Sequence, residues 1–265
     1  MLGTMFANPL VIPTLILAVA LFILGQKLAR RVRHHRLWLF ALALLCLPGF
    51  SFAAVYLHLV REPLWYLQFR SLPAVEMLAA SWGMFFGFLA ADWLENRAVR
   101  YRLLAFALLL AFVPFAKSIM LPVEWRGRIS DKWQEDVCLQ DGSLTCGPAS
   151  LATILRYYGL PTTQREVAMG SFACARSTEN WYLARYTRKC GLRARYLYER
   201  RLDRIPTPAI LGTGTERAGH FVVLFSAHHG QVSIGDPLHG RLTMSEGKFL
   251  GGYGFHGFAI SVTKE

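Results

Sequence analysis

The sequence carries little charge for its length. Asp, Glu, Lys and Arg make up only 17% of its 265 residues, whereas a typical soluble domain carries about 25%. Apolar residues account for 54% of the chain, and its mean hydropathy is +0.31. So little charge combined with so many apolar residues excludes an intrinsically disordered chain, a collagen and a coiled-coil rod.

Charge is missing mainly from the first half of the chain. Lys, Arg, Asp and Glu are absent from residues 1–26, 37–60, 77–91 and 103–116. After Trp125 the composition becomes that of an ordinary soluble domain. The sequence therefore predicts two domains, a transmembrane domain over 1–124 and a globular domain over 125–265.

Four apolar segments approach the length of about 20 residues that a membrane-spanning helix needs. They are residues 8–25, 37–60, 77–94 and 103–123. The third is the weakest candidate because it is short and carries Asp92 near its end. A cleaved signal peptide is the alternative for the first segment, but such a peptide starts with positive charge, and the first basic residue is Lys27.

Basic residues between these segments predict their orientation. The loop 27–36 is the most basic of them and is expected to lie in the cytoplasm. Three further crossings then place residues 125–265 outside the cytoplasm, on the periplasmic side of the cell membrane. If residues 77–94 do not cross, the globular domain lies in the cytoplasm instead.

The net charge of +12 indicates an anionic partner. The arginines of the globular half are scattered and no nucleic-acid-binding motif accompanies them. We therefore expect the lipid bilayer as a partner, and no nucleic acid, because a basic face near anionic lipid accounts for the charge.

The globular half is predicted to place its helices before its strands. The expected helices run from about Cys146 to Tyr158, from a capping box at Thr163–Glu166, and over 177–190. The expected strands are 192–198, 208–211, 220–226, 231–234 and 255–262, with a turn at 228–230 and a short segment at 244–250. A block of helices followed by antiparallel strands indicates an α+β fold, with helices packed on an antiparallel sheet.

A cysteine stands at the start of the first of these helices. Cys146 precedes Gly147 and Pro148, and proline suits the first helical turn. A helix N-terminus carries a partial positive charge and free N–H groups, which favour the thiolate form of a cysteine there. Cys146 is therefore a candidate nucleophile.

Three polar residues complete a candidate catalytic site around that cysteine. His220 begins an apolar strand and Asp236 ends the next one, so a hairpin can bring them side by side. A carboxylate accepting from the imidazole Nδ1–H would orient the histidine as a general base. Gln140, six residues before Cys146, can donate to a developing oxyanion together with the Cys146 backbone N–H.

These motifs resemble a known family. The segment Cys138–Gly159, CLQDGSLTCGPASLATILRYYG, resembles the opening motif of the double-glycine leader cysteine peptidases, papain-like domains fused to bacteriocin-exporting ABC transporters. Residues 219–225, GHFVVLF, and 234–237, IGDP, resemble the family's His strand and Asp-Pro motif. The resemblance covers about residues 135–263. It implies a papain-like peptidase with Cys146, His220 and Asp236 as the catalytic triad and Gln140 as the oxyanion residue.

The leading hypothesis is a membrane-anchored cysteine endopeptidase that cleaves a peptide or leader after small residues such as Gly-Gly. No Walker A pattern occurs, so ATP-driven export would need a separate system. Two alternatives remain. One is a thiol acyl-transferase, because phytochelatin synthases share a similar Cys-Gly-x-Ala helix and triad, and the other is a non-catalytic module that docks leader peptides.

The cysteine pattern does not indicate a metal site or a cofactor. The five cysteines include no Cys-x-x-Cys pair, which argues against zinc. Outside the cytoplasm disulfides are permitted. Cys174 could pair with Cys190, or Cys138 with Cys146, although unpaired buried thiols are equally compatible with the sequence.

Overall fold

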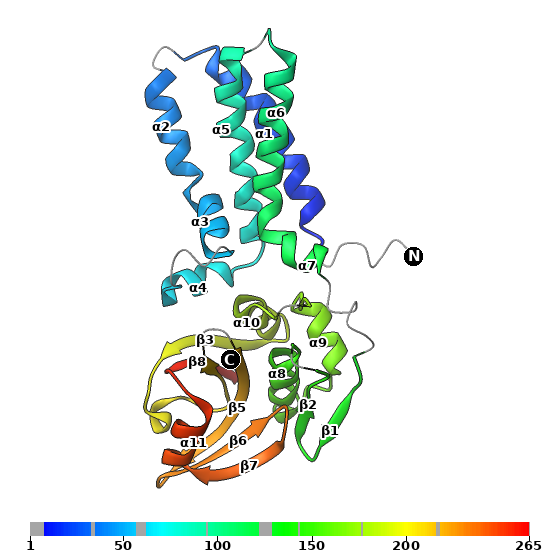
Figure 1. Cartoon of the computed structure of the whole chain (residues 1–265), viewed down its shortest axis with the longest axis vertical. Helices are drawn as coiled ribbons and strands as arrows, with labels where there is room; N and C mark the ends of the chain where they lie inside the picture. The colour runs from blue at the N-terminus through cyan, green and yellow to red at the C-terminus, as the bar shows by residue number, and fades with distance from the viewer. Residues whose placement is uncertain are drawn as a thin grey trace. The chain divides into compact units, whose positions relative to one another are not determined.

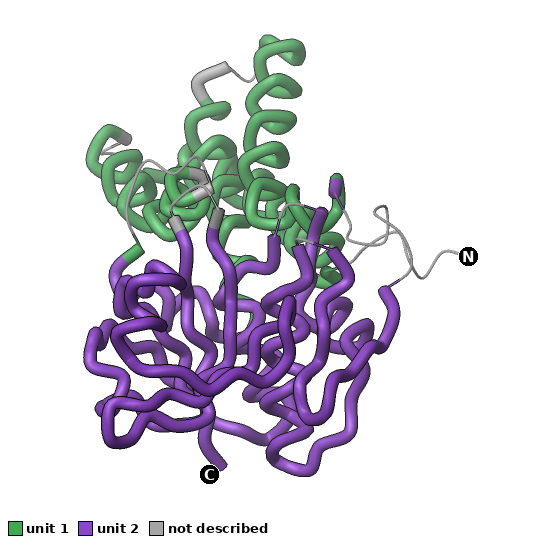
Figure 2. The backbone as a smooth tube through the Cα atoms, turned by 60° about the horizontal axis from the view of Figure 1, so that its bottom comes forward, with its two compact units in different colours: residues 1–62, 74–120 green, residues 63–73, 121–265 purple. Residues whose placement is uncertain are grey.

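A computed structural model describes residues 8–32, 35–56, 62–93, 95–121, 129–142, 144–175, 177–215 and 218–264. The chain divides into two compact units, which Figure 2 shows in different colours. Unit 1 comprises Met1–Glu62 and Ala74–Met120, and unit 2 comprises Pro63–Pro73 and Leu121–Glu265. The predicted boundary at Glu124 lies in residues 122–128, outside the described part.

Unit 1 is built from helices. Its elements in chain order (Figure 1) are α1 (Val11–Ala29), α2 (His35–Leu45), α3 (Leu47–Tyr56), η2 (Val75–Ala80), α5 (Ser81–Leu89), η3 (Ala90–Trp93), α6 (Arg97–Phe112), η4 (Val113–Phe115) and α7 (Ala116–Met120). Large apolar side chains such as Ile16, Phe40 and Leu109 are more than half exposed on its surface. Exposed apolar side chains on several helices of one unit form the kind of surface that contacts a membrane or another protein.

Two helical stretches of the described chain are long and apolar enough to cross a membrane, not the four that the sequence predicts. They are Val11–Ala29 and Arg97–Met120, which match the first and fourth predicted spans. A sharply bent pair, Leu64–Arg70 with Val75–Leu89, would be a third if it formed one span.

The predicted span 37–60 does not form one continuous helix. It is divided between α2 and α3, and residues 57–61 lie outside the described part. Pro48 explains the break, because proline lacks a backbone N–H and its ring clashes with the carbonyl four residues earlier.

Glycines bring α1 and α5 into close backbone contact. A Cβ atom added to Gly83 would overlap the carbonyl oxygen of Ala18, and one added to Gly87 would overlap that of Phe22. Gly25 on α1 meets the Met84 carbonyl in the same way. Small residues at such contacts let apolar helices associate through van der Waals packing of their backbones.

Unit 2 is the α+β part of the chain. Its helices are α4 (Leu64–Arg70), α8 (Cys146–Tyr157), α9 (Gln164–Gly170), α10 (Asn180–Lys189), η6 (Leu202–Arg204) and α11 (Glu246–Tyr253). Its strands are β1 (Lys132–Gln134), β2 (Val137–Leu139), β3 (Leu192–Tyr198), β4 (Ala209–Thr215), β5 (Ala218–His228), β6 (Gln231–Asp236), β7 (Gly240–Ser245) and β8 (Phe258–Lys264). As predicted, the helices α8, α9 and α10 precede the main sheet in the sequence. The helix α4 was not predicted.

Six strands form one antiparallel sheet in the order β3-β8-β4-β5-β6-β7, and β1 pairs with β2 separately. Figure 1 shows α8 beside this sheet. Residues Cys146 to Leu155 of α8 are all buried, and the helix packs against β5. Phe249 of α11 and Leu202 of η6 join a separate cluster with buried residues of β4, β5 and β6. The predicted antiparallel α+β fold is therefore confirmed.

The short helix α4 belongs to unit 2 although it lies between helices of unit 1 in the sequence. Arg185 donates to the Arg70 carbonyl at 2.8 Å, and Arg188 donates to the Ser71 carbonyl at 3.0 Å. The Arg70 guanidinium stacks over the Trp181 ring, 4.4 Å from its centroid. Arginines of α10 thus satisfy carbonyls at the C-terminal end of α4, where cations are favoured.

Candidate active site

Cys146 occupies the first position of α8. Its side chain is largely buried, and the preceding Thr145 makes no side-chain cap to the helix. The Thr145 hydroxyl instead accepts a hydrogen bond from the Asp141 backbone N–H at 3.0 Å and one from Gln164 Nε2 at 3.1 Å. No acidic residue lies in the first turn. The first-turn N–H groups are therefore left without a side-chain acceptor and favour negative charge at this end of the helix.

His220 and Asp236 meet across neighbouring antiparallel strands. The pairing of Val223 with Gly235 places Asp236 opposite Val222, so His220 is its diagonal neighbour two residues further along. Nε2 of His220 lies 2.8 Å from Oδ1 of Asp236. The predicted side-by-side arrangement on a hairpin is thus present, but the carboxylate takes Nε2 and not the Nδ1 that the sequence interpretation assumed. Nδ1 is left for other partners.

The Cys146 thiol is the other hydrogen-bond partner of His220. Burial lowers the pKa of His220, but hydrogen bonds and charge from Asp236 and Cys146 raise it more strongly, to about 9. The imidazole is therefore protonated at neutral pH, and a cation stands between the thiol and the carboxylate.

One hydrogen bond fixes α8 against β5 beside this site. The Ser150 hydroxyl, one turn after Cys146, donates to the Phe221 carbonyl at 3.1 Å. On the other side of β5, the Thr213 hydroxyl donates to the carbonyl of His220 itself at 3.1 Å. These two bonds restrain the backbone that carries the imidazole, so the thiol and the imidazole keep their register.

Asp236 has two further side-chain partners that the sequence interpretation missed. Oδ2 accepts hydrogen bonds from Tyr253 at 2.8 Å and from His239 Nδ1 at 2.9 Å. The Leu238 backbone N–H donates to Oδ1 at 2.9 Å. Burial opposes ionisation of this carboxyl, but the four hydrogen bonds outweigh it and hold the pKa of Asp236 well below its usual range. Asp236 is 1% exposed and ionised.

A sequence signal existed for one of these contacts. Asp236-Pro237-Leu238 has the composition of an Asx-turn, in which an aspartate accepts from the N–H two residues on. Tyr253 lies on α11, which forms within the segment 244–250 and beyond, where the sequence indicated no helix. Its approach to Asp236 depends on tertiary packing alone.

Gln140 follows β2 and is joined to the end of β6. Its backbone N–H donates to the Pro237 carbonyl at 2.9 Å, next to Asp236. Its side-chain nitrogen donates to the Gly142 carbonyl at 2.6 Å, within its own loop. The structure thus brings the backbone of Gln140 to the site, while its side chain is bonded to the Gly142 carbonyl. The role of Gln140 as an oxyanion donor stays a prediction.

The remaining cysteines are unpaired. All five thiols are free, so neither Cys174–Cys190 nor Cys138–Cys146 forms a disulfide. Burial, together with the charges of Asp131 and Asp141, raises the pKa of Cys138 to about 12, which makes it a poor nucleophile. Within the described residues, no group of His, Cys, Asp and Glu has the arrangement of a metal site.

Comparison with known proteins identifies the family. Residues 134–265 match the Peptidase C39 family. The chain belongs to this family. An uncharacterized protein of Methanothermobacter thermautotrophicus is 31% identical to this C39 chain over 110 residues, which are 42% of the chain and 77% of that protein. The probable functional amyloid protease FapD of Pseudomonas fluorescens is 33% identical over 132 residues, 46% of this chain and 58% of FapD.

Solved structures are also similar to part of this chain. A double glycine motif protease from an AMS/PCAT transporter, in complex with the leader peptide, is 21% identical with a TM-score of 0.43 and covers 52% of this chain and 93% of its own. The peptidase domain of Streptococcus ComA, a bi-functional ABC transporter involved in a quorum sensing pathway, is 23% identical to this chain with a TM-score of 0.43. The match covers 48% of this chain and 96% of the ComA domain. The C39 assignment makes the protein a cysteine peptidase, as the sequence predicted.

Proposed function

We propose that this C39 peptidase is a membrane-anchored endopeptidase in which Cys146 is the nucleophile, His220 the acid–base group and Asp236 the residue that orients His220. The observation that carries the proposal is the continuous chain from the Cys146 thiol through His220 to Asp236 Oδ1, with a distance of 2.8 Å at its second link. Each side chain in that chain is of the type that acyl transfer through a thiol requires.

The reaction starts from a thiolate and an imidazolium. The Cys146 Sγ attacks the scissile carbonyl carbon, and the carbonyl oxygen becomes an oxyanion. The protonated His220 then gives its proton to the leaving amine, the C–N bond breaks, and an acyl-thioester on Cys146 remains. Water attacks the thioester while His220 takes its proton, which releases a carboxylate and restores the thiolate–imidazolium pair.

The oxyanion needs hydrogen-bond donors close to Cys146. The backbone N–H of Cys146 at the uncapped start of α8 is one candidate. The Gln140 side chain is the second. It would have to release the Gly142 carbonyl and turn toward the substrate, and the bond from its backbone to Pro237 keeps it within the same part of the site.

The substrate class that we propose is a peptide or protein carrying a leader that ends in small residues such as Gly-Gly. The support is the resemblance of residues 138–159 to the leader peptidases and the leader peptide bound to the AMS/PCAT transporter protease. The similarity to FapD supports a second substrate class, a functional amyloid protein. Either substrate would use the same thioester chemistry.

Membrane anchoring is proposed from unit 1. The helices Val11–Ala29 and Arg97–Met120 are long and apolar enough to span a bilayer. Their exposed apolar side chains would face lipid. The chain would then hold its peptidase unit at the membrane, beside a separate export system.

The test uses the full chain, purified in detergent, with synthetic leader peptides ending in Gly-Gly, and with an amyloid-forming protein as the alternative substrate. Cys146→Ala should abolish cleavage, because no thioester can form, while Cys174→Ala should cleave as wild type does. Gln140→Ala should be slower by about 10² to 10³ in kcat if it is an oxyanion donor. Mass spectrometry should find the acyl group on Cys146, and wild-type turnover by Cys146→Ala would refute the assignment.

A further inference from the structure

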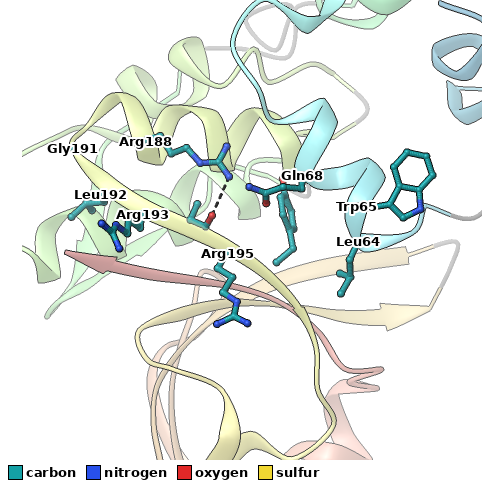
Figure 3. A pocket seen from close by; sticks show the side chains of 10 residues that line it. Leu64, Trp65, Gln68, Arg188, Gly191, Leu192, Arg193 and Arg195 are labelled. Atoms are coloured by element: carbon teal, nitrogen blue, oxygen red, sulfur yellow. Dashed lines mark hydrogen bonds between the residues drawn. The ribbon is translucent and has the colours of Figure 1, made fainter. Parts of the chain in front are cut away.

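The pocket between α4 and β3, which Figure 3 shows, is separate from the catalytic side chains. Its lining comes from α4, the end of α10 and β3, and none of Cys146, His220 and Asp236 belongs to the residues described there. The backbone that leads into Cys146 is held by a different set of residues. Their centre is Thr145, which directly precedes Cys146 and is 2% exposed.

The peptide group between Thr145 and Cys146 carries the N–H that is a candidate oxyanion donor. Its carbonyl oxygen, on Thr145, accepts the Ala149 backbone N–H at 3.0 Å and Gln164 Nε2 at 3.4 Å. A trans peptide group is planar, so its C=O and N–H point in opposite directions and turn together. Hydrogen bonds to the Thr145 carbonyl therefore fix the direction of the Cys146 N–H, and they also polarise it as a donor.

Gln164 holds Thr145 at a second point. Its Nε2 also donates to the Thr145 hydroxyl at 3.1 Å. The same hydroxyl accepts the Asp141 backbone N–H at 3.0 Å and donates to the Asp141 carbonyl at 3.3 Å. Asp141 follows Gln140, whose side chain is the second candidate donor. Thr145 and Gln164 thus join the backbones of both candidate oxyanion donors through one set of hydrogen bonds.

The side chain of Gln164 is fully buried at the start of α9. The capping box of Thr163 and Glu166 begins this helix, and the Gln164 backbone N–H donates to Asp131 Oδ1 at 3.0 Å. Among the described residues no donor reaches Gln164 Oε1. A buried amide oxygen without a donor costs free energy, which an apolar side chain of similar size would avoid. A glutamine at this position is explained if its Nε2 is needed at Thr145.

We propose that Gln164 and Thr145 are positioning residues of the oxyanion site, which aim the Cys146 N–H at the carbonyl oxygen of the peptide bond under attack. The inference rests on the proposed function, in which Cys146 attacks that bond. Both side chains act through the peptide group before Cys146 and not by touching the substrate. Their effect should therefore be confined to steps that form an oxyanion.

The experiment compares two reactions of Cys146 in the full chain, purified in detergent. Cleavage of a synthetic leader peptide ending in Gly-Gly forms an oxyanion, whereas alkylation of the thiol by iodoacetamide does not. Gln164→Met keeps the length of the side chain and loses Nε2. Its kcat should fall about tenfold with KM unchanged, because a donor is misaligned but not removed, against about 10² to 10³ for a removed donor. Its alkylation rate at Cys146, followed by mass spectrometry, should stay that of wild type.

A second variant tests the same contact from the other side. Thr145→Val removes the hydroxyl and keeps the shape, so it should also lower kcat, whereas Thr145→Ser retains the hydroxyl and should restore it. Thr187→Val is the matched control. Thr187 is also buried, and its hydroxyl donates to the Leu183 carbonyl within α10 at 2.9 Å. This control should keep the wild-type kcat. The melting temperature of each variant shows whether it is folded, and if Gln164→Met is not, Thr145→Val decides.

Two results would overturn the proposal. One is a wild-type kcat in folded Gln164→Met or Thr145→Val. The other is an alkylation rate that falls as far as kcat does, which would mean that the thiol itself has moved. Cleavage by Cys146→Ala, or no cleavage by wild type, would refute the proposed function and with it this inference. Normal cleavage by wild type and by both variants would refute the positioning role alone.

Discussion

The buried carboxylate of Asp236 holds a protonated His220 next to Cys146, which determines how activity should depend on pH. In the proposed mechanism His220 must carry a proton to release the leaving amine, so kcat/KM should fall as pH rises through about 9, the pKa of His220. Asp236→Asn removes a negative charge that raises this pKa. The basic limb should then move toward lower pH, closer to the ordinary histidine value of about 6.5.

The pH–rate profile of kcat/KM on a leader peptide measures this shift. Asp203→Asn is the matched control, because Asp203 pairs with Arg201 on an exposed surface away from the site. Its basic limb should stay where the wild-type limb lies. A profile of Asp236→Asn that keeps the wild-type limb would mean that Asp236 does not control the ionisation of His220.

Tyr253 should act on the same carboxylate by positioning it. Tyr253→Phe removes the hydroxyl that donates to Oδ2 but keeps the ring stacked on Phe249, 5.0 Å between centroids. We expect kcat to fall about tenfold with KM unchanged, since one hydrogen bond to a charged group is lost. Tyr157→Phe, at an exposed tyrosine, is the control. Equal kcat for the two variants would remove Tyr253 from the site.

The difference between what the sequence predicted and what it missed at this site has a physical cause. Cys146, His220 and Asp236 lie in local patterns that a linear sequence displays, at a helix start, near the start of one strand and at the end of the next. Tyr253 reaches Asp236 only because α11 packs over the sheet through Phe249. Contacts of that kind depend on tertiary packing and leave no periodic signal in the sequence.

Among the elements, the contact between α1 and α5 is the one most sensitive to a single side chain. Gly87→Leu would place a side chain where the Phe22 carbonyl now lies, and α1 would have to move away. Overpacking of this kind costs about 1–3 kcal/mol. The melting temperature of the full chain in detergent should fall. Ala98→Leu places the same side chain at an exposed position of α6 and should not lower it. Equal stability of the two variants would argue against close packing of α1 and α5.

Element boundaries in unit 2 were well predicted where hydrophobic alternation was regular. β3 matches its predicted range of 192–198, and the turn at 228–230 forms with positive φ at His229 and Gly230. Prediction failed for α4, because residues 61–76 read as a loop with few charges. Arg70 is fully buried against Trp181, a long-range contact that composition alone does not reveal.

At the scale of the whole molecule, α4 constrains the membrane topology. Because α4 and residues 121–264 belong to one unit, joined by Arg185 and Arg188, they must lie on the same side of a membrane. The chain between them therefore crosses an even number of times. If Arg97–Met120 crosses, the segment Val75–Trp93 must cross as well.

That third segment is divided among η2, α5 and η3, and its part Val75–Leu89 passes as a span only together with α4. Residues in η2, α5 and η3 number 6, 9 and 4. Placed end to end, at about 2.0 Å per residue for a 3-10 helix and 1.5 Å for an α-helix, the three elements would extend about 33 Å, against a hydrocarbon core of about 30 Å. If Arg97–Met120 crosses, the predicted span 77–94 has to cross too, and the broken pair α2 and α3 is the crossing that a measurement must decide.

The side on which the peptidase unit lies then follows from the loop 27–36. Its basic residues should hold it in the cytoplasm, and a crossing by α2 and α3 would place both α4 and Cys146 outside. Alkaline phosphatase, which is active only outside the cytoplasm, should be active when fused after Glu265 or after Pro73, and inactive when fused after Arg36.

Equal activity at Pro73 and Glu265 is required by the packing of α4 on α10, whichever side they share. Inactive fusions at all three sites would mean that α2 and α3 do not cross, and would place the peptidase unit where leaders could be trimmed before export. Unequal activity at Pro73 and Glu265 would contradict the assignment of α4 to unit 2.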